Sequence, residues 1–407
     1  MAYRKMGKDI YNVGGSDRRI NMFENIIPLT NGEGVAYNSY LIVDEDAVVL
    51  FDSVDSAVLR DWQENIDNIL EDRPIDYMVI QHVEPDHCAG IIIMLKKYPK
   101  MTIIGNKKSF QFLKQFYFYD AIESGQARVI KEGDTLETKN HKYQFIMAPM
   151  VHWPEVFMTY DSVDKRFFSA DAFGGFKALN GNYWADEVDM NEWIDEMRRY
   201  YINIVGRHGA PVQKLFKKIE DVEIKEIFPL HALCFRDEEN ISLILDLYQK
   251  WSSYTPETTG VVQVYASMYG NSKDLAEEFS ILLAERGVRN IQMFDISQTD
   301  PTTIMAKLFQ YSHAVFHVIN YNTNLYYPMH NLMNELTHTN YQNRKYALTV
   351  SKSWGGQAEK QVQEFLQNMK DVEQIGDTFN ILSRRTSEQM EELQVLADTL
   401  ATSILGN

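Results

Sequence analysis

Two histidines and two carboxylates lie within one six-residue segment of this chain. They are His82, Glu84, Asp86 and His87, and they directly follow the apolar run 77–80, which predicts a buried strand. Imidazole nitrogens and carboxylate oxygens are ligands for divalent metal ions. Crowding such groups at the end of a buried strand is costly unless an ion neutralises them. The segment therefore predicts one edge of a metal site, and a solvated surface turn is the alternative.

Three more candidate ligands, His152, Asp171 and His231, also follow predicted strands. Those strands span 142–148, 166–170 and 225–228. Taken singly, each residue also fits a buried histidine bonded to the backbone or an aspartate in a turn. Ligands at the ends of several strands converge on one crevice, so the set of four histidines and three carboxylates favours a single metal site.

The donor types indicate which metals fit. Nitrogen and oxygen donors without thiolate argue against a structural zinc knot and against an iron–sulfur cluster. Seven donors are too many for one ion, so two ions sharing Asp171 as a bridge is the economical arrangement. Three carboxylates and one bridging hydroxide balance the charge of two divalent ions. Iron or manganese suits this set, whereas zinc also binds but carries no redox chemistry.

Length, composition and charge indicate the class of protein that carries these motifs. A chain of 407 residues predicts two or three domains, and 45% hydrophobic with 24% charged residues is typical of a soluble globular protein. No apolar run reaches membrane-spanning length and the start lacks a signal peptide, so we expect a cytoplasmic protein. The net charge of −17 disfavours nucleic acid and anionic membranes as partners. Cys88 and Cys234 form no CxxC pair, so we expect small apolar filler rather than a disulfide.

The elements that must position the candidate ligands lie in the first half of the chain. Predicted strands are 39–43 and 47–51, and predicted helices are 56–70, 109–118 and 191–204. The polar stretch 252–259 loses all periodicity and predicts a linker. The remaining histidines, His141, His208, His313, His317, His330 and His338, are expected to be mostly solvated or in polar loops.

The second half opens with the layout of a phosphate cradle. The strand 261–265 is followed by a loop rich in small and hydroxyl side chains, then by a helix that runs to about Arg286 and is closed by Gly287. Loop hydroxyls and the N-terminus of the helix favour an anion. The loop has no Walker-type lysine, so a nucleoside triphosphate is disfavoured. A serine and glycine cap of an ordinary helix is the alternative.

Two later loops strengthen the cradle interpretation. Each follows a predicted strand, 314–316 or 346–350, and each bears an aromatic residue. Three such loops after successive parallel strands predict a pocket for flavin mononucleotide (FMN). The expected contacts are Ser267, Met268, Tyr269, Gly270, Asn271, Ser272, Asn320, Tyr321, Asn322, Thr323, Asn324, Ser351, Lys352, Ser353, Trp354 and Gly355.

With these motifs, the chain resembles a flavodiiron protein (A-type flavoprotein) over nearly its whole length. The family's diiron motif, H-x-E-x-D-H followed by His, Asp and His, is matched by the seven candidate ligands. The resemblance implies His82, Glu84 and His152 on one iron of a non-haem diiron site with a bridging oxygen species. It implies Asp86, His87 and His231 on the other iron, with Asp171 bridging.

The resemblance also implies the architecture. It predicts a metallo-β-lactamase-like αββα sandwich over residues 1–254, followed by a flavodoxin-like doubly wound parallel sheet over residues 255–407. The chain ends at Asn407 without a rubredoxin or flavin-reductase segment, so it is similar to the minimal two-domain class.

The implied activity is reduction of dioxygen to water, of nitric oxide to nitrous oxide, or both, in oxygen or nitrosative detoxification. FMN would pass electrons from a donor protein, such as rubredoxin or a flavin- or NADH-dependent reductase, to the irons. The family forms a head-to-tail homodimer or a dimer of dimers, and Trp354 matches a tryptophan near that junction.

The sequence departs from the family pattern in three places. Residues 318–323 replace the usual S-P-T-x-N-N loop, Lys352 stands where an aromatic or small residue is expected, and Ala232 follows His231 where glycine is favoured.

Two other functions compete with the diiron reductase. A zinc hydrolase of the same superfamily favours H-x-H-x-D-H, and here Glu84 replaces the second histidine. Metal analysis separates these, since zinc with ester cleavage identifies the hydrolase. A flavin electron carrier with a vestigial metal half is the second alternative, and the absorbance spectrum of the purified protein tests it.

Overall fold

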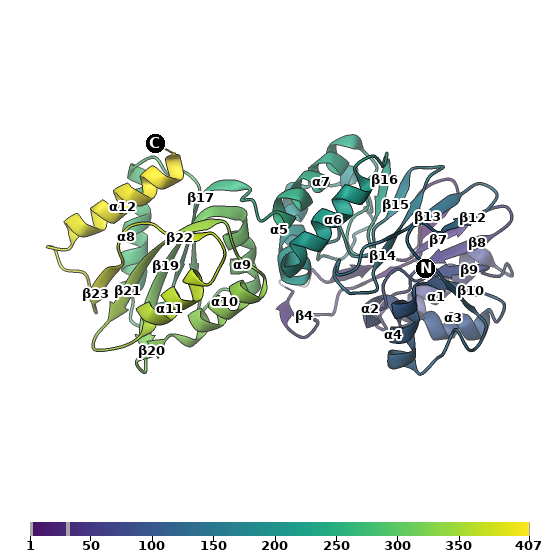
Figure 1. Ribbon diagram of the computed structural model, residues 1–407, viewed down its shortest axis with the longest axis horizontal. Coiled ribbons are helices and arrows are strands. Elements are labelled where there is room, and N and C mark those ends of the chain that lie inside the picture. The colour runs from purple at the N-terminus through teal and green to yellow at the C-terminus, as the bar shows by residue number, and fades with distance from the viewer. Residues whose placement is uncertain (1–2, 30–32, 407) are drawn as a thin grey trace. The chain divides into compact units, whose positions relative to one another are not determined.

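The chain folds into two compact units, one of Met1–Tyr201 with Ala210–Gln249 and one of Ile202–Gly209 with Lys250–Asn407. This division comes from a computed structural model, which describes residues 3–29 and 33–406 (Figure 1). The boundary expected after residue 254 remains a prediction. In the part of the chain that is described, every helix is too short or too polar to cross a membrane.

The first unit is built around two sheets. The larger runs in the order β1 (Arg4–Lys5), β2 (Ile10–Asn12), β7 (Tyr40–Val43), β8 (Val48–Phe51), β9 (Tyr77–Val79), β10 (Thr102–Gly105) and β11 (Ala127–Val129). The smaller runs in the order β12 (Thr135–Glu137), β13 (Lys142–Met147), β14 (Phe157–Asp161), β15 (Arg166–Phe168) and β16 (Glu226–Phe228). Two short pairs accompany them, β3 (Gly15–Asp17) with β6 (Val35–Tyr37) and β4 (Met22–Phe23) with β5 (Ile27–Pro28).

The two sheets share one core. Phe51 of β8 stacks on Phe168 of β15 with ring centroids 4.1 Å apart, and Tyr40 of β7 meets Phe228 of β16 at 5.1 Å. Alternation explains this packing, because β13 exposes Lys142 and Gln144 while Tyr143 and Phe145 face the core.

Helices cover the outer faces of both sheets. Beside the larger sheet lie α1 (Leu59–Leu70), α3 (Ile91–Lys97) and α4 (Lys107–Tyr117), and beside the smaller lie α5 (Asn191–Tyr200), α6 (Gly209–Ile219) and α7 (Glu238–Ser252) (Figure 1). The side chain of Asn106 caps α4 by accepting from the backbone N–H groups of Lys108 and Ser109. This arrangement confirms the predicted αββα sandwich.

The second unit is a parallel sheet with helices on both faces. Its strands run in the order β18 (Ile291–Asp295), β17 (Thr258–Tyr265), β19 (Tyr311–Tyr321), β21 (Arg344–Lys352) and β22 (Val372–Gln374). At its carboxyl end β21 also pairs in parallel with β23 (Phe379–Leu382), and β19 pairs with the short antiparallel β20 (Asn324–Leu325). Helices α8 (Asn271–Glu285) and α12 (Met390–Leu405) pack on one face. Helices α9 (Pro301–Gln310), α10 (Tyr327–His338) and α11 (Ala358–Gln367) belong to the other. The sheet reverses its order beside β17, which confirms the flavodoxin-like doubly wound fold.

Some predictions of local structure were wrong. The strand expected at 314–316 continues to Tyr321 and turns back into β20, so the second flavin loop is a tight hairpin. The predicted linker is shorter than expected, because α7 continues to Ser252 and β17 begins at Thr258. The helix expected over 191–204 changes to a π-helical turn at Tyr201–Val205. His141, His313 and His317 are buried rather than solvated.

Candidate metal centre

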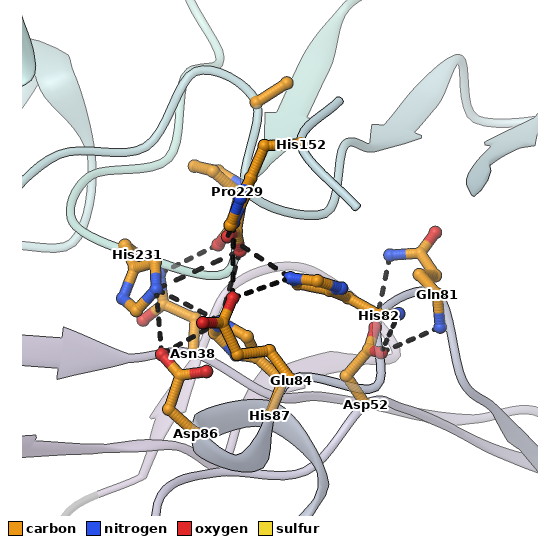
Figure 2. A network of polar contacts seen from close by, with 12 residues as sticks. Asn38, Asp52, Gln81, His82, Glu84, Asp86, His87, His152, Pro229 and His231 are labelled. Atoms are coloured by element: carbon orange, nitrogen blue, oxygen red, sulfur yellow. Dashed lines mark hydrogen bonds and ion pairs between the residues drawn. The ribbon is translucent and has the colours of Figure 1, made fainter. Parts of the chain in front are cut away.

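The first group of donors meets between the ends of the two sheets. His82 and Glu84 lie in the loop after β9, and His152 lies in the loop after β13 (Figure 2). Glu84 Oε2 lies 3.0 Å from His82 Nε2 and 3.2 Å from His152 Nε2. With Asp171, the ligand atoms of these residues all lie within 4.8 Å of one another.

The second group of donors lies beside the first. Asp86 and His87 sit on the one-turn helix α2 (Pro85–Cys88), and His231 follows β16. The two Nε2 atoms of His87 and His231 are 3.0 Å apart, and Asp86 Oδ2 lies 3.3 Å and 3.4 Å from them. The structure thus brings all seven predicted ligands into two adjoining groups, and their binding of metal remains a prediction.

Asp171 faces both groups with different oxygens. Its Oδ2 lies 3.1 Å from His152 Nε2, and its Oδ1 lies 3.1 Å from His87 Nε2. Asp171 follows β15 and is only 2% exposed, so water does not screen its charge. This placement fits a bridging carboxylate.

The donor set fits a pair of cations on chemical grounds. The Nδ1 of His231 donates to a backbone carbonyl, so its Nε2 offers a lone pair toward the other donors. In the described residues, Asp86 Oδ1 and His87 Nδ1 are buried without a hydrogen-bond partner. Buried polar atoms of this kind are costly unless an ion or another group satisfies them.

The pKa values of these groups reflect their mutual attraction. Burial alone lowers the pKa of His82, but the carboxylates of Asp171 and Glu155 raise it well above its ordinary value. Burial alone raises the pKa of Asp171, yet the imidazoles of His87 and His82 hold it well below its ordinary value. The Asp171 carboxylate is therefore ionised, and a bound cation would take the place of the protons on the imidazoles.

Residues outside the motif hold the ligands in place. Glu155 is fully buried, and its Oε1 accepts from His82 Nδ1 at 2.8 Å and from the N–H of Val83 at 3.0 Å. His231 Nδ1 donates to the backbone carbonyl of Ala36 at 2.8 Å. Both contacts leave Nε2 of the histidine free to bind metal.

Other supporting residues act on the loops that carry the ligands. Asn38 donates to the carbonyls of Pro229 and Ala232, on either side of His231, at 2.9 and 3.0 Å (Figure 2). Asp52 accepts from the N–H groups of Gln81 and His82. The sequence analysis named none of these supporting residues, because each binds a segment that lies far from it along the chain.

Aromatic residues form the wall beside the second group. Tyr37, Phe23 and Tyr200 place their rings 5.5, 5.8 and 5.4 Å from the ring of His231. Tyr200 is fully buried, and its hydroxyl has no hydrogen-bond partner within the described part of the chain. Burial, followed by Asp171 and Asp86, raises the pKa of Tyr200 well above its ordinary value, so the hydroxyl keeps its proton.

The second unit holds a small hollow of about 70 Å³ where the three predicted flavin loops meet. It is lined by Ser267, Met268, Tyr269, Asn271, Ser272, Ile319, Asn320, Ser351, Lys352, Ser353 and Ser383. Nine of these eleven belong to the predicted contacts. Ile319 and Ser383 were missed, the latter because it follows β23, a strand that the sequence analysis did not predict. Gly270, Tyr321, Asn322, Thr323, Asn324, Trp354 and Gly355 do not line the hollow.

The hollow fits the phosphate end of a flavin nucleotide. It is the size of a phosphate group rather than of a whole ligand, and hydroxyls and the N-terminus of α8 surround it. Aromatic side chains nearby in sequence are exposed, among them Tyr269 at 88% and Trp354 at 65%. Such exposed aromatic faces are available to stack on a flat ring.

Comparison with known proteins agrees with this description. Residues 35–232 match the family described as ODP family beta lactamase. The anaerobic nitric oxide reductase flavorubredoxin of Escherichia coli O1:K1 is 29% identical over 339 residues, which cover 82% of this chain and 69% of the relative.

Solved structures resemble the chain over its whole length. Rubredoxin oxygen:oxidoreductase from Desulfovibrio gigas has a TM-score of 0.91 at 22% identity and covers 100% of this chain and 99% of its own. The flavodiiron protein from Giardia intestinalis has a TM-score of 0.89 at 23% identity, with 100% and 97% covered. The chain therefore has the fold of these flavodiiron structures, and its residues 35–232, which match the ODP family beta lactamase, precede a flavodoxin-like unit.

Proposed function

We propose that this protein is a flavodiiron oxidoreductase that reduces dioxygen to water, nitric oxide to nitrous oxide, or both. The observation that supports this proposal most directly is Asp171, whose two oxygens face two separate groups of histidine and carboxylate donors. A single-ion site does not require a carboxylate placed in this way. The names of the relatives include both a nitric oxide reductase and an oxygen oxidoreductase, which supports both substrates.

Two irons bound by the seven ligands would supply the redox chemistry, and FMN in the second unit would supply electrons. The protein's own residues then have defined tasks. Glu155 and the Ala36 carbonyl orient His82 and His231, and the low exposure of the ligands keeps bulk water out. The buried Tyr200 hydroxyl is a proton-bearing group beside His231 that is not one of the seven predicted ligands.

We further infer the surroundings in which the protein works. Electrons would come from a donor protein such as a rubredoxin or a flavin- or NADH-dependent reductase, by analogy with the name of the Desulfovibrio gigas relative. We also infer that the protein forms a head-to-tail homodimer or a dimer of dimers and works in the cytoplasm.

The test is to load the full chain anaerobically with ferrous iron and FMN and to measure metal, flavin and gas consumption with one reduced donor. We expect about two irons per chain, bound flavin, and consumption of at least one gas. Asp171→Ala should lose iron and turnover. The control Asp186→Ala removes a carboxylate that pairs with Arg236 at the surface, so it should change neither. Full iron content and turnover in Asp171→Ala would contradict the proposal, and zinc with ester cleavage would support a hydrolase.

A further inference from the structure

The hollow in the second unit has one charged residue in its lining. That residue is Lys352, and the other ten are serines, asparagines, methionine, tyrosine and isoleucine. Five serine hydroxyls belong to this lining, and no carboxylate does. A hollow with hydroxyl groups and a single cation favours a small anion.

Lys352 is available to bind such an anion. Within the described residues it has no carboxylate partner, in contrast to Lys273 and Arg385 nearby. Lys273 on α8 pairs with Glu277 at 2.6 Å, and Arg385 pairs with Glu278 through two contacts of 2.8 and 2.6 Å. The positive charge of Lys352 is therefore the unpaired charge at the hollow.

The backbone around Lys352 is fixed by its neighbours. Its carbonyl accepts from the N–H of Ser383 at 2.9 Å, and Lys352 lies opposite Leu382 in the parallel pair β21–β23. The hydroxyls of Ser353 and Ser383 are 2.7 Å apart at the same point. Lys352 thus extends from a supported strand end, and its side chain is only partly exposed, so solvent screens its charge incompletely.

We propose that Lys352 is a specificity-determining residue that binds the 5′-phosphate of a flavin nucleotide, together with the serine hydroxyls and the N-terminus of α8. This inference rests on the proposed function, because it assumes that FMN binds in the second unit. The size of the hollow favours the phosphate over the ring as the partner of Lys352. The consequence is a preference for FMN over riboflavin that a neutral side chain at this position does not provide.

The test measures binding of FMN and of riboflavin to the flavin-free full chain by quenching of flavin fluorescence. Lys352→Gln should weaken FMN binding by about tenfold and leave riboflavin binding within about twofold, while Lys352→Arg should retain most of the preference. Inorganic phosphate should compete with FMN in the unsubstituted protein and less so in Lys352→Gln. The control Lys370→Gln removes an equal charge from an exposed lysine in the same unit, and its binding should be unchanged.

The other outcomes are distinguishable. An equal loss of FMN and riboflavin binding in Lys352→Gln, or a change only in affinity for the reduced flavin, would place Lys352 at the ring and overturn the inference. Unchanged FMN binding would overturn it as well, while iron content and gas consumption would still support the proposed function. Failure of the unsubstituted, iron-loaded protein to bind any flavin would overturn both.

Discussion

Replacing Glu155 tests whether the residues behind the ligands control the metal centre. Glu155→Gln keeps an acceptor oxygen for His82 Nδ1 and for the N–H of Val83 but removes the negative charge. A hydrogen bond to a charged group contributes about 1.5–3 kcal/mol and a neutral one about 0.5–1.5 kcal/mol. The difference of about 1–1.5 kcal/mol predicts roughly tenfold weaker iron binding. That value lies at the lower end of the ~10–100-fold effects typical of such partners.

The assay is an anaerobic competition titration of the full chain with a ferrous chelator. Glu155→Ala should weaken binding further, because it leaves the N–H of Val83 and His82 Nδ1 buried without an acceptor, at a cost of about 1–3 kcal/mol. The matched control is Glu64→Gln, which neutralises an exposed carboxylate paired with Arg60 on α1. Equal iron affinity in Glu155→Gln and Glu64→Gln would refute the reasoning that Glu155 supports the metal through His82.

Three further predictions follow from particular contacts. A Cβ at Gly356 would lie 1.8 Å from Asn320 Oδ1, whereas a Cβ at Gly355 would meet nothing within 4 Å. Gly356→Ala should therefore weaken FMN binding by ~5–150-fold, the equivalent of ~1–3 kcal/mol of overpacking, whereas Gly355→Ala should leave it unchanged. Equal FMN affinities of the two variants would contradict this prediction. Burial lowers the pKa of His141, but its contacts with Asp161 and Asp9 raise it from 6.5 to about 9. The protonated ring therefore stabilises the folded state fully below pH 6.5, and this stabilisation is lost as the pH rises through about 9. Urea unfolding should show that His141→Gln costs about 1–2 kcal/mol near neutral pH and little above about pH 9, and a cost independent of pH would count against it. Removing iron with a chelator should lower the free energy of unfolding by about 4 kcal/mol, compared with protein in free iron at ~1,000 times its Kd. Equal thermal stability of the iron-free and iron-loaded forms would argue against metal binding in the folded state.

The positions of the predicted ligands could be derived from the sequence because they depend on local sequence. His82, His152, Asp171 and His231 each follow a strand that the apolar pattern indicates, and the sheets bring those strand ends together. The fold class was predicted through the resemblance to flavodiiron proteins, whereas the residues of the second half alone indicated only three loops after successive parallel strands. The prediction of the metal site thus needed only the order of the elements and the side-chain type at each strand end.

The supporting residues were not predictable in the same way. Asn38 lies far along the chain from the carbonyls of Pro229 and Ala232 that it binds, and no local pattern joins them. His317 was expected in a polar environment, yet Thr349 and Gln263 each contact one of its ring nitrogens at 2.8 Å across neighbouring strands. Burial lowers the pKa of His317 to about 3, so the ring stays neutral. A buried histidine of this kind is stable only because its partners come from other strands.

The backbone at the metal centre explains why strand ends alone do not define it. Ala170, directly before Asp171, has a φ of +49°, and Ala232, directly after His231, has a φ of +59°. Non-glycine residues in this left-handed region cost roughly 1–2 kcal/mol each. The cost is offset where the turns are held by hydrogen bonds, since the Ala170 carbonyl accepts from Leu230 N–H at 2.9 Å and the Ala232 carbonyl from Asn38. The same bond between residues 170 and 230 ties the Asp171 turn to the His231 turn. The positions of the predicted ligands Asp171 and His231 are therefore set by two strained turns that support each other. A change in either turn should shift the side chains of both donor groups.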